Sequence, residues 1–71
     1  MLIHDFLELI WSNLTKIHIW NNENSDILFF GTVEECKQDT KINWYDWGIV
    51  SLYLTTEKID EPVLYIQAMH V

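Results

Sequence analysis

The stretch TKIHIWNNENSDILFF, residues 15–30, decides the fold, because two apolar runs flank a polar turn. In the first run Ile17 and Ile19 alternate with polar or amphipathic residues, the period of a strand that buries one face. Residues 21–26 are turn formers without an apolar side chain, and 27–30 reads as a second strand. We therefore predict a β-hairpin here.

Periodicity and turn signals outside this hairpin indicate four further elements. They are a helix over 2–14, a short helix over 33–38, a strand over 49–56 and a last strand over 63–69, with a turn at 56–62. Thr32 and Glu35 form a capping-box pattern in front of the second helix. The order α-β-β-α-β-β predicts one α+β domain, 1–71, with two layers: a four-stranded antiparallel sheet and helices on one face.

A sheet with helices on one face leaves its other face to solvent or to a partner. By alternation the outward set is Lys16, His18, Trp20, Ser51, Tyr53, Thr55, Tyr65 and Gln67, with Val50, Leu52 and Leu54 on the inward side. The three large aromatic residues of the outward set exceed what solubility needs, which favours a binding surface or a homodimer interface. The alternative is that they form cross-strand pairs that stabilise a small sheet.

The segment WYDWG at 44–48 gathers three aromatic residues around Asp46. We expect one or two of Trp44, Tyr45 and Trp47 to close the end of the core, because Trp and Tyr are largely buried in small domains. The alternative is a protruding loop whose aromatic side chains contact a partner.

The chain is acidic, yet it is apolar enough to fold. Its 71 residues include 11 Asp or Glu, four Lys and no Arg, for a formal charge of −7, and 49% are hydrophobic. The hydrophobic content excludes a disordered acidic tail. The small number of basic residues disfavours direct nucleic-acid binding, which needs clustered Lys or Arg. The carboxylates are either a solubilising surface or an imitation of a phosphate backbone that occupies a basic channel on another protein.

Motifs for catalysis or metal binding are missing from the sequence. It has two glycines and no HExxH or CxxC pattern, and a lone cysteine on the inner side of a helix is usually a small core residue. We therefore expect no enzyme and no cofactor. The metal-ligand types available are scattered, unlike those of structural zinc sites: His4, His18, Cys36 and His70. A structural divalent metal such as zinc on these residues is the alternative.

The single cysteine excludes an intrachain disulfide and hence a disulfide-stapled secreted miniprotein. Residues 1–11 are apolar, but they lack the basic start of a signal peptide and include Asp5 and Glu8. No run approaches the roughly eighteen apolar residues of a membrane span. We expect a cytosolic protein without membrane contact.

The motifs FGTVEE at 30–35, WGIVS at 47–51 and VLYI at 63–66 resemble small proteins carried by phages and conjugative elements of Gram-positive bacteria. Some proteins of this size and acidity are anti-CRISPR inhibitors. The resemblance implies a non-enzymatic inhibitor that acts in the bacterial cytosol and binds a type II CRISPR nuclease. Such inhibitors often occupy a region of the nuclease meant for nucleic acid.

Under this hypothesis two groups of residues contact the nuclease. The charge comes from Glu34, Glu35, Asp39, Asp46, Asp60 and Glu61, and the anchors are Trp20, Trp44, Tyr45 and Trp47. The alternative hypothesis is a structural or accessory module of a phage or mobile element that homodimerises through its sheet and inhibits nothing.

Overall fold

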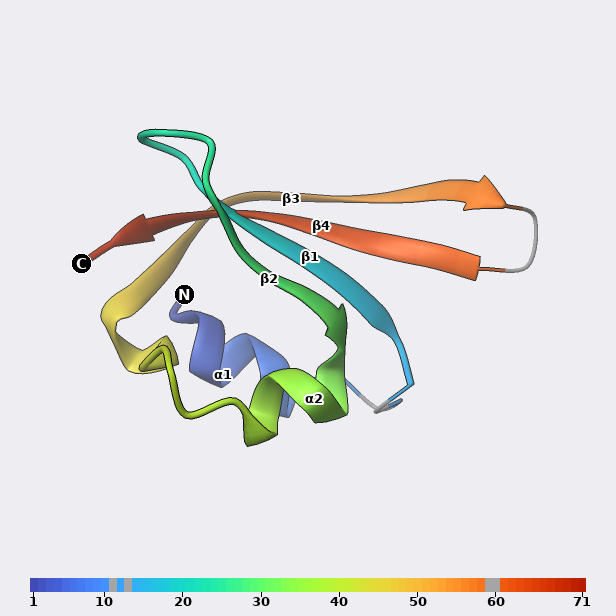
Figure 1. The fold of residues 1–71 in the computed structure, drawn as a ribbon, viewed down its shortest axis with the longest axis horizontal. Helices are drawn as coiled ribbons and strands as arrows, with labels where there is room; N and C mark the ends of the chain where they lie inside the picture. Colours follow the sequence, from blue (N-terminus) through green and yellow to red (C-terminus); the bar gives the residue numbers. More distant parts are fainter. Residues whose placement is uncertain (11, 13, 59–60) are drawn as a thin grey trace.

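The protein folds as a four-stranded sheet with two short helices packed against one face (Figure 1). The computed structural model describes the backbone of residues 1–10, 12, 14–58 and 61–71, and the side chains of all of these except 55–58 and 61. The elements are α1 (Ile3–Glu8), β1 (Lys16–Asn21), β2 (Ile27–Thr32), α2 (Val33–Gln38), the 3-10 turn η1 (Trp44–Asp46), β3 (Trp47–Lys58) and β4 (Glu61–His70). The α+β class is confirmed.

The strand order is β2-β1-β4-β3, and the two central strands are parallel. The prediction of a purely antiparallel sheet was wrong. Thr32, at the end of β2, is level with Val63 of β4, whereas Trp47, at the start of β3, is level with His70. The segment between them, 33–46, therefore crosses beneath the sheet from one end to the other. As a result β3 runs in the direction of β2, and β4 runs parallel to β1.

The β1–β2 hairpin forms as predicted, and its turn is held by asparagine side chains. The Oδ1 atom of Asn21 accepts a hydrogen bond from the Glu23 N–H at 2.9 Å, and that of Asn24 accepts one from the Asp26 N–H at 3.0 Å. Ser25 has a φ of 63°, a left-handed conformation that turns tolerate better than strands do. These local bonds pair backbone N–H groups of the turn with side-chain oxygens in place of a carbonyl on the opposite strand.

Helix α2 has the predicted bounds because its start is fixed locally. The Thr32 Oγ1 accepts a hydrogen bond from the Glu35 N–H at 3.2 Å, and the Glu35 Oε1 accepts one from the Thr32 N–H at 3.0 Å. This reciprocal cap satisfies two donors that the helix itself cannot pair. The helix buries Val33 and Cys36 and ends at Asp39, which is extended.

Helix α1 is shorter than the predicted 2–14. It ends at Glu8, and the N–H groups of Leu9 and Ile10 donate to carbonyls three residues back, which closes the last turn. Leu14, the last residue of the predicted helix, lies in a turn and is 76% exposed. Trp11 and Asn13, which belonged to the predicted helix, lie outside the described residues.

Strands β3 and β4 are longer than predicted, and they extend beyond the helices (Figure 1). Leu52 and Leu54 lie opposite Ile66 and Leu64, so they do share the helix side of the sheet. They are nevertheless 45% and 62% exposed, because the helix layer ends before it reaches them. Val50, at a register shift, is exposed as well. The predicted side is therefore confirmed for Leu52 and Leu54, but the helices do not bury this part of it.

Strand β4 is central although it contains Pro62, a residue that is usually confined to edge strands or strand starts. Its pairing with β1 begins at Val63, one residue after the proline. The missing N–H of Pro62 therefore falls where β1 has not yet begun, and it interrupts no hydrogen bond to that strand.

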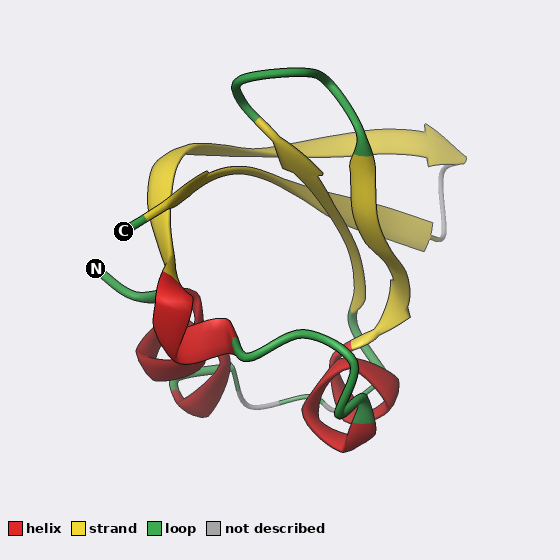
Figure 2. Cartoon of the chain, turned by 60° about the vertical axis from the view of Figure 1, so that its left-hand side comes forward, coloured by secondary structure: helices red, strands yellow, loops and turns green. Residues whose placement is uncertain are grey.

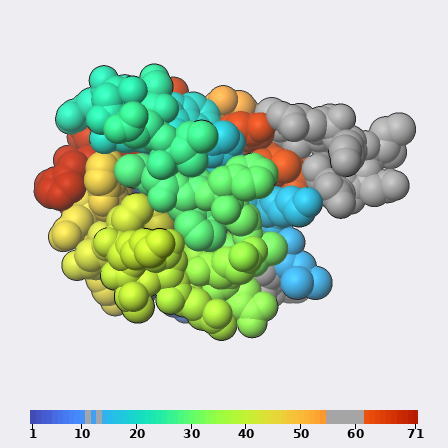
Figure 3. Space-filling view, viewed as in Figure 1, coloured from blue at the N-terminus to red at the C-terminus, as the bar shows by residue number. Residues whose placement is uncertain are grey.

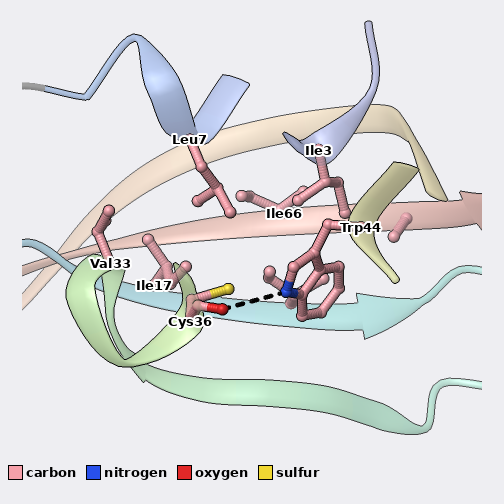
Figure 4. Close-up of a cluster of buried hydrophobic side chains, with 9 residues drawn as sticks. Ile3, Leu7, Ile17, Val33, Cys36, Trp44 and Ile66 are labelled. Atoms are coloured by element: carbon pink, nitrogen blue, oxygen red, sulfur yellow. Dashed lines mark hydrogen bonds between the residues drawn. The ribbon is translucent and has the colours of Figure 1, made fainter. Parts of the chain in front are cut away.

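The core lies between the sheet and the helices, and the sheet curves over it (Figures 2 and 4). Its buried members are Ile3, Leu7, Ile17, Ile19, Val33, Cys36, Trp44, Ile66 and Ala68. No charged or polar residue is buried in the part of the chain that the structure describes. The core is therefore small and wholly apolar apart from the indole N–H of Trp44 and the Cys36 thiol.

Because Ile66 is fully buried and Ile27 is 64% exposed, the same substitution distinguishes core from surface. We expect Ile66→Val to lower the free energy of unfolding by about 1 kcal/mol, since it removes a buried methyl group and leaves a small void. Ile27→Val should change it by less than about 0.5 kcal/mol. Urea denaturation followed by circular dichroism measures both values, and equal losses would contradict the proposed placement of the core.

Candidate functional site

A row of rings crosses all four strands on the side of the sheet that faces away from the helices. The direct cross-strand partners are Phe30 with His18, His18 with Tyr65, and Tyr65 with Tyr53. Trp20, two residues further along β1, packs against the same group, with ring centroids 5.8 Å from those of His18 and Tyr65. We refer to these five residues as the aromatic face.

The rings of the aromatic face contact one another. Tyr53 and Tyr65 are stacked, with centroids 5.4 Å apart and planes 4° from parallel. The other side of Tyr65 meets the His18 ring at 5.0 Å, and Phe30 meets His18 edge to face at 5.3 Å. Tyr65 therefore has ring neighbours on two sides, whereas Phe30 and Tyr53 stand at the two ends of the row.

The two ends of the row are the most exposed. Phe30 is 60% exposed and Tyr53 is 47% exposed, while His18, Trp20 and Tyr65 are half-buried by their neighbours. Both helices lie on the opposite side of the sheet (Figure 1). The predicted cross-strand pairing is confirmed, but pairing alone leaves large apolar area in water at both ends of the row.

Polar residues border this row, as alternation predicted. The Ser51 hydroxyl donates to the Gln67 side-chain oxygen across β3 and β4, which places both on the aromatic face side. Lys16 is half-buried on the same side of β1. The side chain of Thr55 lies outside the described residues.

Phe30 was missed as a member of this surface. The hairpin register shifts between Ile19 and Trp20, so simple alternation across β1 and β2 does not identify the partner of each residue. Counting back from the second strand's end would have placed Phe30 opposite His18. The signal available in the sequence was the capping box at Thr32, which fixes the end of β2 and therefore the residue from which the partner of His18 can be counted.

The aromatic segment 44–48 mainly closes the core, as expected. Trp44 is 6% exposed, and its indole Nε1 donates to the Cys36 carbonyl at 3.3 Å (Figure 4). Trp47 is half-buried against the core and meets the His70 ring at 5.2 Å. Tyr45 is 55% exposed and stacks on His4 at 3.9 Å. Of these three residues, only Tyr45 offers a largely exposed ring to a partner.

The carboxylates proposed for partner binding fall mostly on one segment. Glu34, Glu35, Asp39 and Asp46 belong to 33–46, which forms the lower part of the surface in Figure 3. Glu34, Glu35 and Asp46 are exposed, and the Asp39 Oδ1 accepts a hydrogen bond from the Lys41 N–H at 2.8 Å. Asp60 and the side chain of Glu61 lie outside the described residues. The described members are therefore on the helix side, away from the aromatic face.

Glu35 has a specific structural role within this acidic segment. Hydrogen bonds from the backbone N–H and then the hydroxyl of Thr32 hold the pKa of its carboxyl below the usual value. The ionised carboxylate is the form that accepts both bonds, so ionisation and capping support each other. The negative charge of Glu35 therefore stabilises the start of α2.

The candidate metal ligands lie in different surroundings. His4 lies beside Asp5 and stacks on Tyr45, His18 is in the aromatic face, and His70 meets Trp47. Cys36 is fully buried, and burial, followed by the charge of Asp39, raises the pKa of its thiol to about 12. It is therefore a protonated core residue at neutral pH. Within the described residues, no group of three or more His, Cys, Asp or Glu could hold a metal ion.

Comparison of the chain with protein-family models, curated proteins and solved structures found no match. Neither helix among the described residues has the length and apolar character needed to cross a membrane. The function is therefore argued from the geometry of the surface.

The capping role of Glu35 predicts a pH-dependent contribution to stability. Its folded-state pKa is lowered, so the contribution is present above the usual pKa of about 4.5 and is lost as the pH falls through the folded-state pKa. We expect wild type to be more stable than Glu35→Gln at pH 7, with the difference shrinking as the pH falls below about 4.5. Urea denaturation at stepped pH measures this difference.

Glu34→Gln is the matched control, because Glu34 lies in the same exposed first turn and makes no part of the capping box. Its difference from wild type should vary less with pH than that of Glu35→Gln. A Glu35→Gln difference that stays constant from neutral to acid pH would contradict the ionic cap.

Proposed function

We propose that this protein is a non-enzymatic protein-binding module and that the aromatic face is its contact surface. The observation that carries the proposal is the row of rings across four strands, exposed at Phe30 and Tyr53, on the side of the sheet opposite the helices. Exposed apolar groups bordered by polar residues are typical of protein interfaces.

Ring orientation favours a polypeptide over a nucleobase or a sugar as the partner. Proteins that bind single-stranded nucleic acid offer a free ring face on which a base stacks, within a positively charged groove. Here Tyr65 has ring neighbours on both sides, at 5.4 Å and 5.0 Å. The chain also has no arginine and a formal charge of −7. Mutually packed aromatic rings without clustered Lys or Arg instead suit packing against side chains of another protein.

The residues of the aromatic face are of the types that dominate binding energy in interfaces. Trp and Tyr combine a large contact area with few rotatable bonds, so they lose little entropy when a partner orders them. The cross-strand contacts already restrict Trp20 and Tyr65 before binding. The face is therefore partly preorganised, which lowers the cost of association.

Site-specific photo-crosslinking tests the proposal inside the expressing cell. We expect p-benzoylphenylalanine in place of Phe30, at the exposed end of the aromatic face, to form a covalent adduct with a protein upon irradiation. The same group in place of Tyr45, which is similarly exposed on the helix side, is the matched control and should give little or no adduct. Mass spectrometry identifies the attached chain.

Adducts from position 45 alone, or adducts to nucleic acid from position 30, would contradict the proposed contact surface. The mass of an adduct from position 30 also shows whether the partner is another protein or a second copy.

A second candidate function, inhibition of a basic nucleic-acid-handling nuclease, is favoured by the acidic segment 33–46. Its exposed Glu34, Glu35 and Asp46 lie on the side opposite the aromatic face, where they leave that face unobstructed. In this proposal the carboxylates imitate a phosphate backbone in the cytosol of a bacterial host, as the resemblance to anti-CRISPR proteins implies. Charge complementarity would guide the encounter with the nuclease.

Inhibition by this route should depend on salt and on the carboxylates. With a purified type II CRISPR nuclease, we expect inhibition of DNA cleavage to weaken as salt rises from about 50 mM to about 300 mM, because screening acts on exposed charges. The double variant Glu34→Gln with Asp46→Asn should weaken it at low salt, whereas Tyr53→Ser, on the other side, should not. Inhibition that is insensitive to salt and to the double variant would reject charge mimicry.

A further inference from the structure

We infer that the partner of the aromatic face is a second copy of this chain, packed face to face as a two-fold symmetric dimer. The inference rests on the proposed function, since it assigns a partner to the same surface. A two-fold dimer places the same patch of both copies in contact, so the patch must be compatible with itself in charge, shape and area.

The charge distribution permits self-association through this face and opposes it through the other. The described side chains on the aromatic face side include no carboxylate, and their basic groups are Lys16 and His18. Exposed carboxylates lie on the helix side at Asp5, Glu8, Glu34, Glu35 and Asp46, and in the β1–β2 turn at Glu23 and Asp26. Two copies with a formal charge of −7 each therefore approach with least repulsion when their sheets meet.

The shape of the face suits packing against another sheet. Sheets that pack face to face lie about 10 Å apart and interdigitate the side chains of their inner faces. The stacked rings of Tyr53 and Tyr65 lie next to the shorter residues Ser51 and Gln67 on the same two strands. The large rings of one sheet can pack over the shorter side chains of an identical sheet.

The area of the face limits how strongly two copies can associate. Four strands of 6 to 12 residues form the face. With strands about 4.8 Å apart and about 3.3 Å per residue, its flat area is roughly 500 Å². Side-chain relief raises the accessible area, but the sheet curves over the core (Figure 2), so this face is convex and two copies meet over its central part, burying less than the roughly 800 Å² per partner of a standard interface.

The small core gives a physical reason for the dimer to form. Ten hydrophobic residues are buried among those described, and the single cysteine cannot form an intrachain disulfide. Domains of this length rarely gain much stability from one core, and association is one of the ways in which they add buried apolar area. Face-to-face packing would bury Phe30 and Tyr53, which the monomer leaves largely exposed.

Adjacent residues of β3 provide a matched test, because Tyr53 belongs to the aromatic face and Leu54 points to the helix side. Sedimentation equilibrium from about 1 to about 100 µM should show a wild-type dimer. Tyr53→Lys should raise the dimer dissociation constant at least about 30-fold, the effect expected at an interface hot spot. Leu54→Lys, at a residue 62% exposed, should leave it within about threefold of wild type.

Far-ultraviolet circular dichroism establishes that each variant is folded, and Phe30→Lys replaces Tyr53→Lys if the latter unfolds. A wild type that stays monomeric throughout the range overturns the inference, as does a dimer dissociated by Leu54→Lys and not by Tyr53→Lys. A monomeric wild type that still crosslinks from position 30 to another protein would leave the proposed function intact and reject only the second copy as partner.

Discussion

The parallel pairing of β1 with β4 is the contact on which the rest of the structure depends. Its register places Ile17 and Ile19 beside Leu64 and Ile66, which together supply the sheet side of the core. The same register places His18 beside Tyr65 on the opposite side. A shift by one residue would exchange the two sides of a strand, so the apolar core and the aromatic face are fixed by one alignment.

The helix layer determines which parts of the sheet remain open. Two helices of six residues each cover only one side of the sheet and only part of its length. Leu52 and Leu54 are exposed for this reason, and the aromatic face is open because both helices lie on the other side. The carboxylates of 33–46 are on the helix side, and the described side chains on the aromatic face side include none. This separation of carboxylates from apolar surface is the basis of the proposed sheet-to-sheet contact.

Features set by neighbouring residues could be predicted from the sequence. The capping pair Thr32 and Glu35 determines the start of α2, and the alternation around Ile17 determines which side of β1 is buried. Features set by distant contacts could not. The parallel pairing depends on how segment 33–46 crosses the sheet, and the exposure of Leu54 depends on where the helices end. Phe30 was missed because a register shift in the hairpin interrupts the alternation.

The central claim is that the aromatic face contacts a second copy of the chain. Isotope-filtered nuclear Overhauser spectroscopy on a mixture of labelled and unlabelled protein tests it most directly, because it detects only contacts between copies. We predict intermolecular signals from the ring protons of Phe30 and Tyr53 to aromatic-face protons of the other copy, and none from Leu54 or Tyr45. Intermolecular signals confined to Leu54 or Tyr45, or no intermolecular signal at millimolar concentration, would contradict the account.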